Sequence, residues 1–215
     1  MRQSVSIETY LRLSPVIPVV TVDDATAAPD LARALVRGGI RIMEVTLGNP
    51  EALPAIEAIA RAEPDMSVGA AMVLSMSDLH TAATAGASFA TSPGSTAALL
   101  AAANLATIPY LPGIATVSEL MSGLAAGFHC FKFFPTAAAG GTAMLRTLAG
   151  PFPDAQFCPT GGITQETVRS YLELPNVLCT SGSWLAPPDA LAARDWVRIE
   201  ALASKAVAVE LREAP

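Results

Sequence analysis

The sequence is poor in charged residues, cysteine and histidine. Charged residues make up 15% of its 215 residues, and 13 Lys and Arg against 19 Asp and Glu give a formal net charge of −6. Basic residues so few and so scattered argue against nucleic acid as a partner. The odd set of cysteines, Cys130, Cys158 and Cys179, and the isolated His80 and His129 lack the spacing of a disulfide framework or a zinc site. We therefore expect buried thiols, two histidines at the surface or in packing, and no metal or cofactor.

The chain also lacks long apolar runs. Gly, Pro or polar residues interrupt every apolar segment well before a bilayer could be spanned, and the start, MRQSVSIETYLRLS, lacks the apolar stretch of a signal peptide. Together with the unpaired cysteines, this predicts a cytoplasmic protein without a membrane partner. The hydrophobic fraction is nevertheless 52%, which is typical of elements buried on more than one face or of an apolar contact between subunits.

Short apolar segments alternate with Ala-rich amphipathic segments along the whole chain. The predicted strands cover residues 16–22, 41–47, 66–73, 88–93, 107–113, 130–135, 155–162 and 177–183. The predicted helices cover residues 24–38, 50–63, 76–86, 95–104, 116–126, 140–149, 164–173 and 189–211, with an extra helix near 4–13. Eight such units at intervals of roughly 25 residues predict a parallel sheet, either a closed barrel or an open doubly wound sheet. The short chain and the absence of G-x-G-x-x-G after the first strand favour a single α/β domain, a (β/α)8 TIM barrel over residues 1–215.

A lysine stands in the middle of the apolar segment FHCFKFFPT, residues 128–136. Burying an unpaired ammonium is unfavourable, and burial favours the neutral amine of a lysine, which is the form that attacks a carbonyl. By the two-residue period of a strand, Lys132 shares its face with Phe134, and Glu44 shares its face with Thr46. Both ionisable side chains are therefore predicted to face the barrel mouth. Two interpretations stay open: a Schiff-base lysine with a proton-carrying glutamate, or a buried structural ion pair.

Glycine marks the ends of the last two predicted strands, in PTGGIT (159–164) and TSGSW (180–184). The loops after the seventh and eighth strands are the usual phosphate site of a barrel, because backbone N–H groups at bare glycines face the anion there. Gly161, Gly162, Gly182 and Ser183 are therefore candidate phosphate ligands. The alternative is that both segments are simply tight turns.

These segments together resemble the 2-keto-3-deoxy-6-phosphogluconate (KDPG) aldolases, also known as 4-hydroxy-2-oxoglutarate (KHG) aldolases. The resemblance runs in order through nearly the whole chain, on PVIPVV (15–20), GGIRIMEVTL (38–47), SPG (92–94), IPYLPGIATVSEL (108–120), FKFFP (131–135), AGPFP (149–153), FCPTGGIT (157–164) and GSWL (182–185). It implies a (β/α)8 barrel with an extra N-terminal helix, a homotrimer, and class I aldolase chemistry without a metal. The implied reaction cleaves KDPG to pyruvate and glyceraldehyde 3-phosphate, or runs in reverse.

The resemblance also implies roles for individual residues. Lys132 would form the Schiff base and Glu44 would act as general acid and base. Pro93 would line the pyruvate end of the site, and Thr160 would contact the acceptor and influence its stereochemistry. The substrate phosphate would be held by Gly161, Gly162 and Ser183.

Two positions depart from the family pattern. Many members read EVTLRT where this chain reads EVTLGN, so Gly48 stands where an arginine binds the pyruvate carboxylate. They also read GAGTVL where this chain reads GAAMVL, so Met72 replaces a threonine hydroxyl. Some relatives carry an arginine at the end of strand one instead, where this chain has Thr21. Losing these partners would weaken carboxylate binding by about 1.5–3 kcal/mol for each charge-assisted hydrogen bond. Gly48 and Met72 also make the donor pocket roomier and more apolar, so we expect altered donor specificity.

Two other functions fit parts of the pattern. A sugar-phosphate isomerase or epimerase would share the barrel and the phosphate loops, but it would leave Lys132 idle. A non-catalytic trimeric barrel would explain Gly48 and Met72, but not the presence of Glu44, Lys132 and both glycine turns. The aldolase is therefore the leading hypothesis, with oxo-acids, aldehydes or sugar phosphates as substrates.

Overall fold

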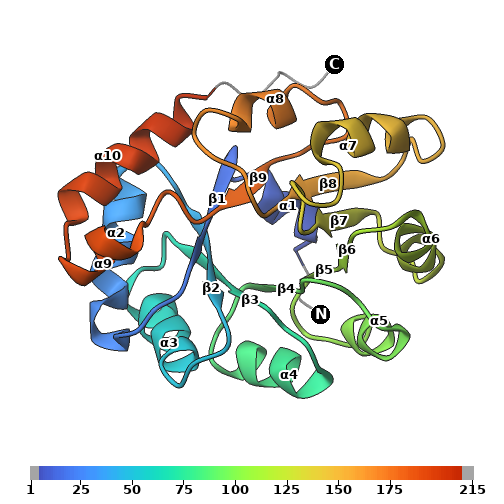
Figure 1. Cartoon of the computed structure of the whole chain (residues 1–215). Helices are drawn as coiled ribbons and strands as arrows, with labels where there is room; N and C mark the ends of the chain where they lie inside the picture. Colours follow the sequence, from blue (N-terminus) through green and yellow to red (C-terminus); the bar gives the residue numbers. More distant parts are fainter. Residues whose placement is uncertain (1–4, 210–215) are drawn as a thin grey trace.

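Parallel strands alternate with helices throughout residues 5–209, which the computed structural model describes (Figure 1). The strands are β1 (Val16–Val20), β2 (Ile42–Thr46), β3 (Ser67–Ala71), β4 (Phe89–Thr91), β5 (Tyr110–Leu111), β6 (Gly113–Ile114), β7 (Cys130–Phe133), β8 (Gln156–Pro159) and β9 (Thr180–Gly182). The helices are α1 (Ile7–Leu11), the 3-10 turn η1 (Ala25–Ala27), α2 (Ala28–Arg37), α3 (Ala52–Ala62), α4 (Met76–Thr84), α5 (Ala97–Ala103), α6 (Val117–Ala125), α7 (Gly141–Ala149), α8 (Val168–Leu172), α9 (Pro188–Ala192) and α10 (Trp196–Val207). Each predicted strand is present. Seven have shorter bounds, and the fifth, predicted over 107–113, is divided into β5 and β6 and ends at Ile114.

The strands pair in two curled parallel sheets, in the orders β5-β4-β3-β2-β1-β9 and β6-β7-β8. The α/β class and the parallel pairing are thereby confirmed, but the pairs do not form the single closed ring that was predicted. Two local features separate the sheets. Pro112 divides the predicted fifth strand into β5 and β6, because proline has no N–H for a ladder. Between β8 and β9 the pairing consists of two isolated bridges, Phe157↔Val177 and Thr160↔Ser181.

Side chains alternate between two apolar layers, as the strand period requires. Residues such as Val16 and Val20 of β1 pack outward against the helices that surround the strands. Ile17 of β1 faces the inside of the curl, in a cluster with Phe89 and Leu11. Leu11 belongs to α1, which lies inside the ring of elements in Figure 1. This helix fills the interior near the N-terminal ends of the strands. The C-terminal ends of the strands are therefore left for a site.

The last predicted helix, 189–211, is wrong as a single element. It is divided into α9 and α10, and Arg194 between them has φ 51°. Asp195 then starts α10 as its N-cap, because its side chain accepts a hydrogen bond from the Arg198 N–H. Residues 210–211 of this prediction, and residue 4 of the first helix, lie outside the described residues. No helix within 5–209 is both long enough and apolar enough to cross a bilayer.

Helix starts were predicted with mixed success. Thr116 is the N-cap of α6, in a capping box with Glu119. Thr164, expected to begin the next-to-last helix, lies in a turn before it, and α8 begins at Val168. The Thr164 N–H instead donates to the Thr167 hydroxyl.

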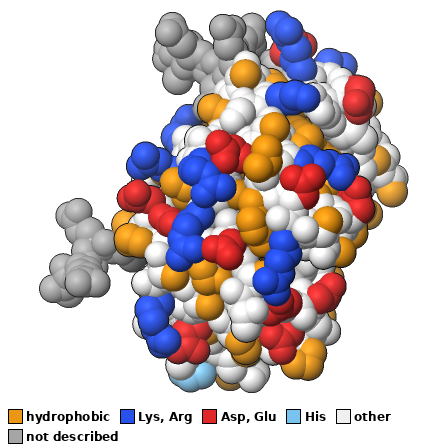
Figure 2. Space-filling model, turned by 90° about the vertical axis from the view of Figure 1, so that its left-hand side faces the viewer, with side chains coloured by type: hydrophobic (Ala, Val, Ile, Leu, Met, Phe, Trp, Pro, Cys, Tyr) orange, Lys and Arg blue, Asp and Glu red, His pale blue; other side chains and the backbone are white. Residues whose placement is uncertain are grey.

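The face turned toward the viewer in Figure 2, on the side of α2, α9 and α10, mixes basic, acidic and apolar side chains. Two ion pairs join these helices. Arg37–Glu200, at 2.7 Å, joins α2 to α10, and Arg198–Asp189, at 2.6 Å, joins α10 to α9. Charges on this face are therefore interleaved.

Candidate active site

Lys132 and Glu44 meet in the interior of the curled strands. Lys132 lies on β7 and Glu44 on β2, and Lys132 Nζ donates to Glu44 Oε2 at 2.5 Å. The exposed fraction of the side chain is 5% for Lys132 and 0% for Glu44. The second carboxylate oxygen, Glu44 Oε1, has no hydrogen-bond partner among the described residues. A buried acceptor without a partner is costly, so this oxygen is available to a substrate hydroxyl or a water molecule.

Thr91 of β4 completes this cluster, and the sequence analysis missed it. Its hydroxyl accepts from Lys132 Nζ at 3.0 Å and donates to Glu44 Oε2 at 3.2 Å. Thr91 is fully buried. A polar residue two positions after Phe89, in an otherwise apolar strand, was the available signal. The hydroxyl fixes the amine and the carboxylate relative to each other.

The floor beneath the cluster is apolar because a glycine makes room for it. Gly69 pairs with Glu44 on one side and with Phe89 on the other. A Cβ on Gly69 would lie 2.3 Å from Cζ of Phe89, so only glycine admits this ring. Tyr10 of α1 stacks on the same ring at 5.4 Å. The stacked rings of Phe89 and Tyr10 therefore close the interior beneath the ion pair, on the side of α1.

A hydroxyl network holds the loop that carries Pro93. Tyr110 Oη donates to Ser92 Oγ at 2.5 Å, and the Gly113 N–H donates to the same oxygen at 3.1 Å. Ser95 Oγ lies 3.1 Å from Tyr110 Oη. Burial raises the pKa of Tyr110, although its hydrogen bonds with Ser92 and Ser95 act in the opposite direction. The phenol thus stays protonated and positions the loop beside the strand ends.

The glycines after β8 have a conformational reason to be glycine. Gly161 has φ 95° and Gly162 has φ 77°, a region that L-residues rarely adopt. A Cβ on Gly162 would also lie 2.5 Å from the Cβ of Ala137. At Gly182 a Cβ would lie 2.8 Å from the indole of Trp184. Tight geometry alone therefore accounts for these residues.

The two glycine segments lie side by side. Thr160 directly follows β8 and bridges to Ser181 of β9. The Thr160 N–H donates to the buried Thr136 hydroxyl at 2.8 Å, and the Thr160 hydroxyl lies 3.3 Å from the Cys158 carbonyl. Ser183, after β9, is exposed. The candidate phosphate residues thus lie on neighbouring segments at the C-terminal ends of β8 and β9.

The two positions that depart from the family pattern, Gly48 and Met72, follow the C-terminal ends of β2 and β3. Gly48 has φ 141°, and a Cβ there would meet nothing within 4 Å. Met72 has φ 60° and an exposed fraction of 36%. Phe134 and Pro93, both partly exposed, lie in the loops after β7 and β4.

No lysine or arginine occurs in the loops that follow the strands, at residues 21–24, 47–51, 72–75, 92–96, 115–116, 134–140, 160–167 and 183–187.

The three cysteines are free and buried, as predicted, and the two histidines are exposed. Burial raises the pKa of Cys130 to about 11. A hydrogen bond with Cys179 lowers the pKa of Cys158, while burial raises that of Cys179.

Comparison with known proteins gives one consistent result. Residues 7–202 match the family model described as KDPG and KHG aldolase. The KHG/KDPG aldolase of Escherichia coli (strain K12) is 51% identical over 202 residues, covering 94% of this chain and 95% of the relative. The 2-dehydro-3-deoxy-phosphogluconate aldolase of Pseudoalteromonas atlantica is 49% identical over 204 residues and covers 95% of both chains.

Solved structures agree with the sequence comparison. The KDPG aldolase of Legionella pneumophila, with pyruvate captured at low pH as a covalent carbinolamine intermediate, has a TM-score of 0.91 and 45% identity, covering 93% of this chain and 97% of its own. The aldolase of Zymomonas mobilis ZM4 with 3-phosphoglycerate has a TM-score of 0.92 and 41% identity, covering 97% and 98%.

Proposed function

The chain belongs to the KDPG and KHG aldolase family and is a KDPG aldolase, a carbon–carbon lyase, and we propose that Lys132 and Glu44 perform its chemistry. One observation carries the assignment of residues: a buried amine and a buried carboxylate lie 2.5 Å apart inside the curled strands. Lys132 is the amine that forms the Schiff base, and Glu44 carries the protons. The carbinolamine in the Legionella relative supports this type of intermediate.

The reaction follows from these two groups. Transfer of a proton from Nζ to Oε2 leaves a neutral amine, which attacks the C2 carbonyl carbon of KDPG to form a carbinolamine. Glu44 returns the proton to the hydroxyl, which leaves as water and gives the iminium. Oε1 or Oε2 then accepts the proton of the C4 hydroxyl, so the C3–C4 bond breaks and its electrons enter an enamine. Protonation of C3 and hydrolysis release pyruvate and regenerate the lysine.

The substrate ends occupy opposite sides of this pair. We assign the phosphate to the backbone at Gly161, Gly162 and Gly182 and to the Ser183 hydroxyl, and the acceptor carbons to Thr160. Pro93 lines the donor side, and Phe134, whose ring lies beside Gly161, lines the phosphate side. No cationic side chain occurs in the loops after the strands, so in this assignment backbone N–H groups and the Ser183 hydroxyl hold the anion.

Donor specificity is altered in this proposal. The open space at Gly48 and the partly exposed Met72 leave the carboxylate of pyruvate without a cationic partner. We therefore expect pyruvate to bind weakly, and donors without a carboxylate to bind about as well. Gly48 also has a backbone conformation that an arginine would not readily adopt, so reintroducing the arginine needs a loop rearrangement.

Borohydride trapping tests the proposal. The protein is incubated with pyruvate, or with acetone as a donor without a carboxylate, and borohydride then reduces any imine to a stable amine. Mass spectrometry identifies the modified peptide. We expect adducts on Lys132 with both donors, and none in Lys132→Met. If low concentrations of pyruvate gave the adduct and acetone gave none, altered donor specificity would be refuted. Absence of any adduct, with KDPG cleavage intact, would refute the role of Lys132.

The wider organisation completes the proposal. We infer that residues 1–215 form one (β/α)8 domain, supported by the two bridges between the β8 and β9 segments and by the single residue, Pro112, that separates β5 from β6. We also infer a cytoplasmic homotrimer, supported by the family resemblance and by the exposed apolar Leu74 and Met76 at the start of α4. Light scattering after size-exclusion chromatography measures the subunit number.

A further inference from the structure

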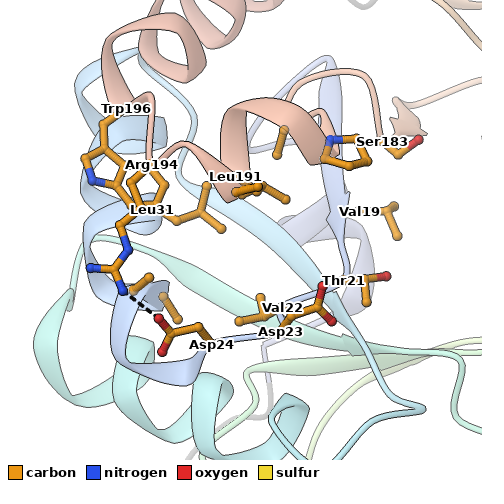
Figure 3. Close-up of a pocket in the computed structure, with 15 residues that line it drawn as sticks. Val19, Thr21, Val22, Asp23, Asp24, Leu31, Ser183, Leu191, Arg194 and Trp196 are labelled. Carbon is orange, nitrogen blue, oxygen red and sulfur yellow. Dashed lines mark hydrogen bonds and ion pairs between the residues drawn. The ribbon is translucent and has the colours of Figure 1, made fainter.

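A crevice of about 510 Å³ opens beside the strand ends (Figure 3). Val19, Thr21 and Ser183 lie at one end of it, and Arg194 and Trp196 lie at the other. It therefore extends from the ends of β1 and β9 to the junction of α9 and α10. Its volume is typical of a site for a small molecule.

The crevice begins at the level of the catalytic pair. Val19 is the partner of Glu44 across β1 and β2, and paired residues of neighbouring strands point to the same face. Thr21 lies two residues further along that face. Neither Glu44 nor Lys132 lines the crevice. It is thus a continuation of the barrel mouth, on the side of Ser183.

The lining of the crevice selects against anions. Leu31, Leu191 and Trp196 provide apolar walls, and the charged side chains are Asp23, Asp24 and Arg194. The guanidinium of Arg194 is already held by Asp24 at 2.6 Å. Hydrogen bonds from the side chain and backbone of Thr26 lower the pKa of Asp24, so this carboxylate is ionised at neutral pH. An additional phosphate or carboxylate would meet net negative charge, whereas an uncharged apolar group would meet walls that it can desolvate.

We propose that this crevice is a second acceptor subsite, which takes the uncharged aromatic or aliphatic tail of an aldehyde that extends past Ser183. This inference rests on the proposed function, because the aldehyde carbon must reach the enamine formed on Lys132. Glyceraldehyde 3-phosphate ends at Ser183 and the glycine segments. A longer aldehyde that ends in a ring, such as 5-phenylpentanal, reaches past Ser183 and carries its ring into the crevice.

Two neighbouring alanines give a matched test. Ala192 lines the crevice, and Ala193 does not; both are exposed at the end of α9. For aldol addition to pyruvate, we would measure kcat/KM for 5-phenylpentanal and for glyceraldehyde 3-phosphate. Ala192→Trp is expected to lower the ratio of the first to the second at least fivefold, because the indole fills the crevice. Ala193→Trp is expected to leave this ratio within twofold of the unmodified protein.

Three outcomes would overturn the subsite: an unchanged ratio in Ala192→Trp, an equal fall in Ala193→Trp, or no turnover of 5-phenylpentanal by the unmodified protein. Failure of the unmodified protein with glyceraldehyde 3-phosphate would instead count against the proposed function. The two failures are therefore distinguishable.

Discussion

Replacing Thr91 by valine tests whether the buried hydroxyl positions the reacting groups. Valine keeps the shape of the side chain and removes the oxygen that lies 3.0 Å from Lys132 Nζ and 3.2 Å from Glu44 Oε2. A hydrogen bond to a charged group contributes about 1.5–3 kcal/mol. Counting only the shorter contact, and with a factor of ten for each 1.4 kcal/mol, we expect kcat for KDPG cleavage to fall about 10–100-fold.

The assay separates positioning from binding. Thr91 contacts the catalytic pair, so KM is expected to change less than threefold while the rate of borohydride trapping falls together with kcat. Thr91→Ser retains the hydroxyl and serves as the control, with kcat expected within about threefold of the unmodified protein. Equal kcat values in the valine and serine variants would show that the hydroxyl does not position Lys132 or Glu44.

Three further predictions concern stability. Lys132→Met leaves the Glu44 carboxylate buried without its partner, so urea denaturation should show a loss of about 3–5 kcal/mol, largely restored in the double variant with Glu44→Met; additive losses would contradict this coupling. Because the folded pKa of Cys130 is raised to about 11 from 9.0, the folded protein keeps a proton that the unfolded chain loses, and the free energy of unfolding should decrease between pH 9 and 11 by up to about 2–3 kcal/mol. Cys130→Ala should reduce this slope, and an unchanged slope would refute the assignment. Gly162→Ala should lower the free energy of unfolding by at least about 1–2 kcal/mol, because Gly162 has a left-handed backbone. Gly150→Ala is the control and should be nearly neutral, because Gly150 has φ −69° and open space around it. Thermal unfolding of both variants measures the difference, and equal stability would contradict the prediction.

Local periodicity was enough to predict most elements, because strands and helices bury their faces with fixed periods of 2 and 3.6 residues. It failed where one residue changed the local backbone. Arg194 adopts a left-handed conformation and ends α9 inside a segment whose pattern is helical throughout. Pro112 interrupts the fifth strand, although the apolar pattern continues on both sides of it.

The sequence by itself determined which side chains face the interior of the strands. Lys132 and Glu44 could be placed there from the two-residue period alone, and the resemblance to a known family then suggested their roles. Only the tertiary structure decided that these groups, 88 positions apart, meet at 2.5 Å, and that Thr91 binds both. The same holds for the crevice, whose walls come from β1, α2, α9 and α10. Such distances depend on strand register and on the curl of the sheets, which arise from contacts between segments far apart in the chain and leave no local pattern in the sequence.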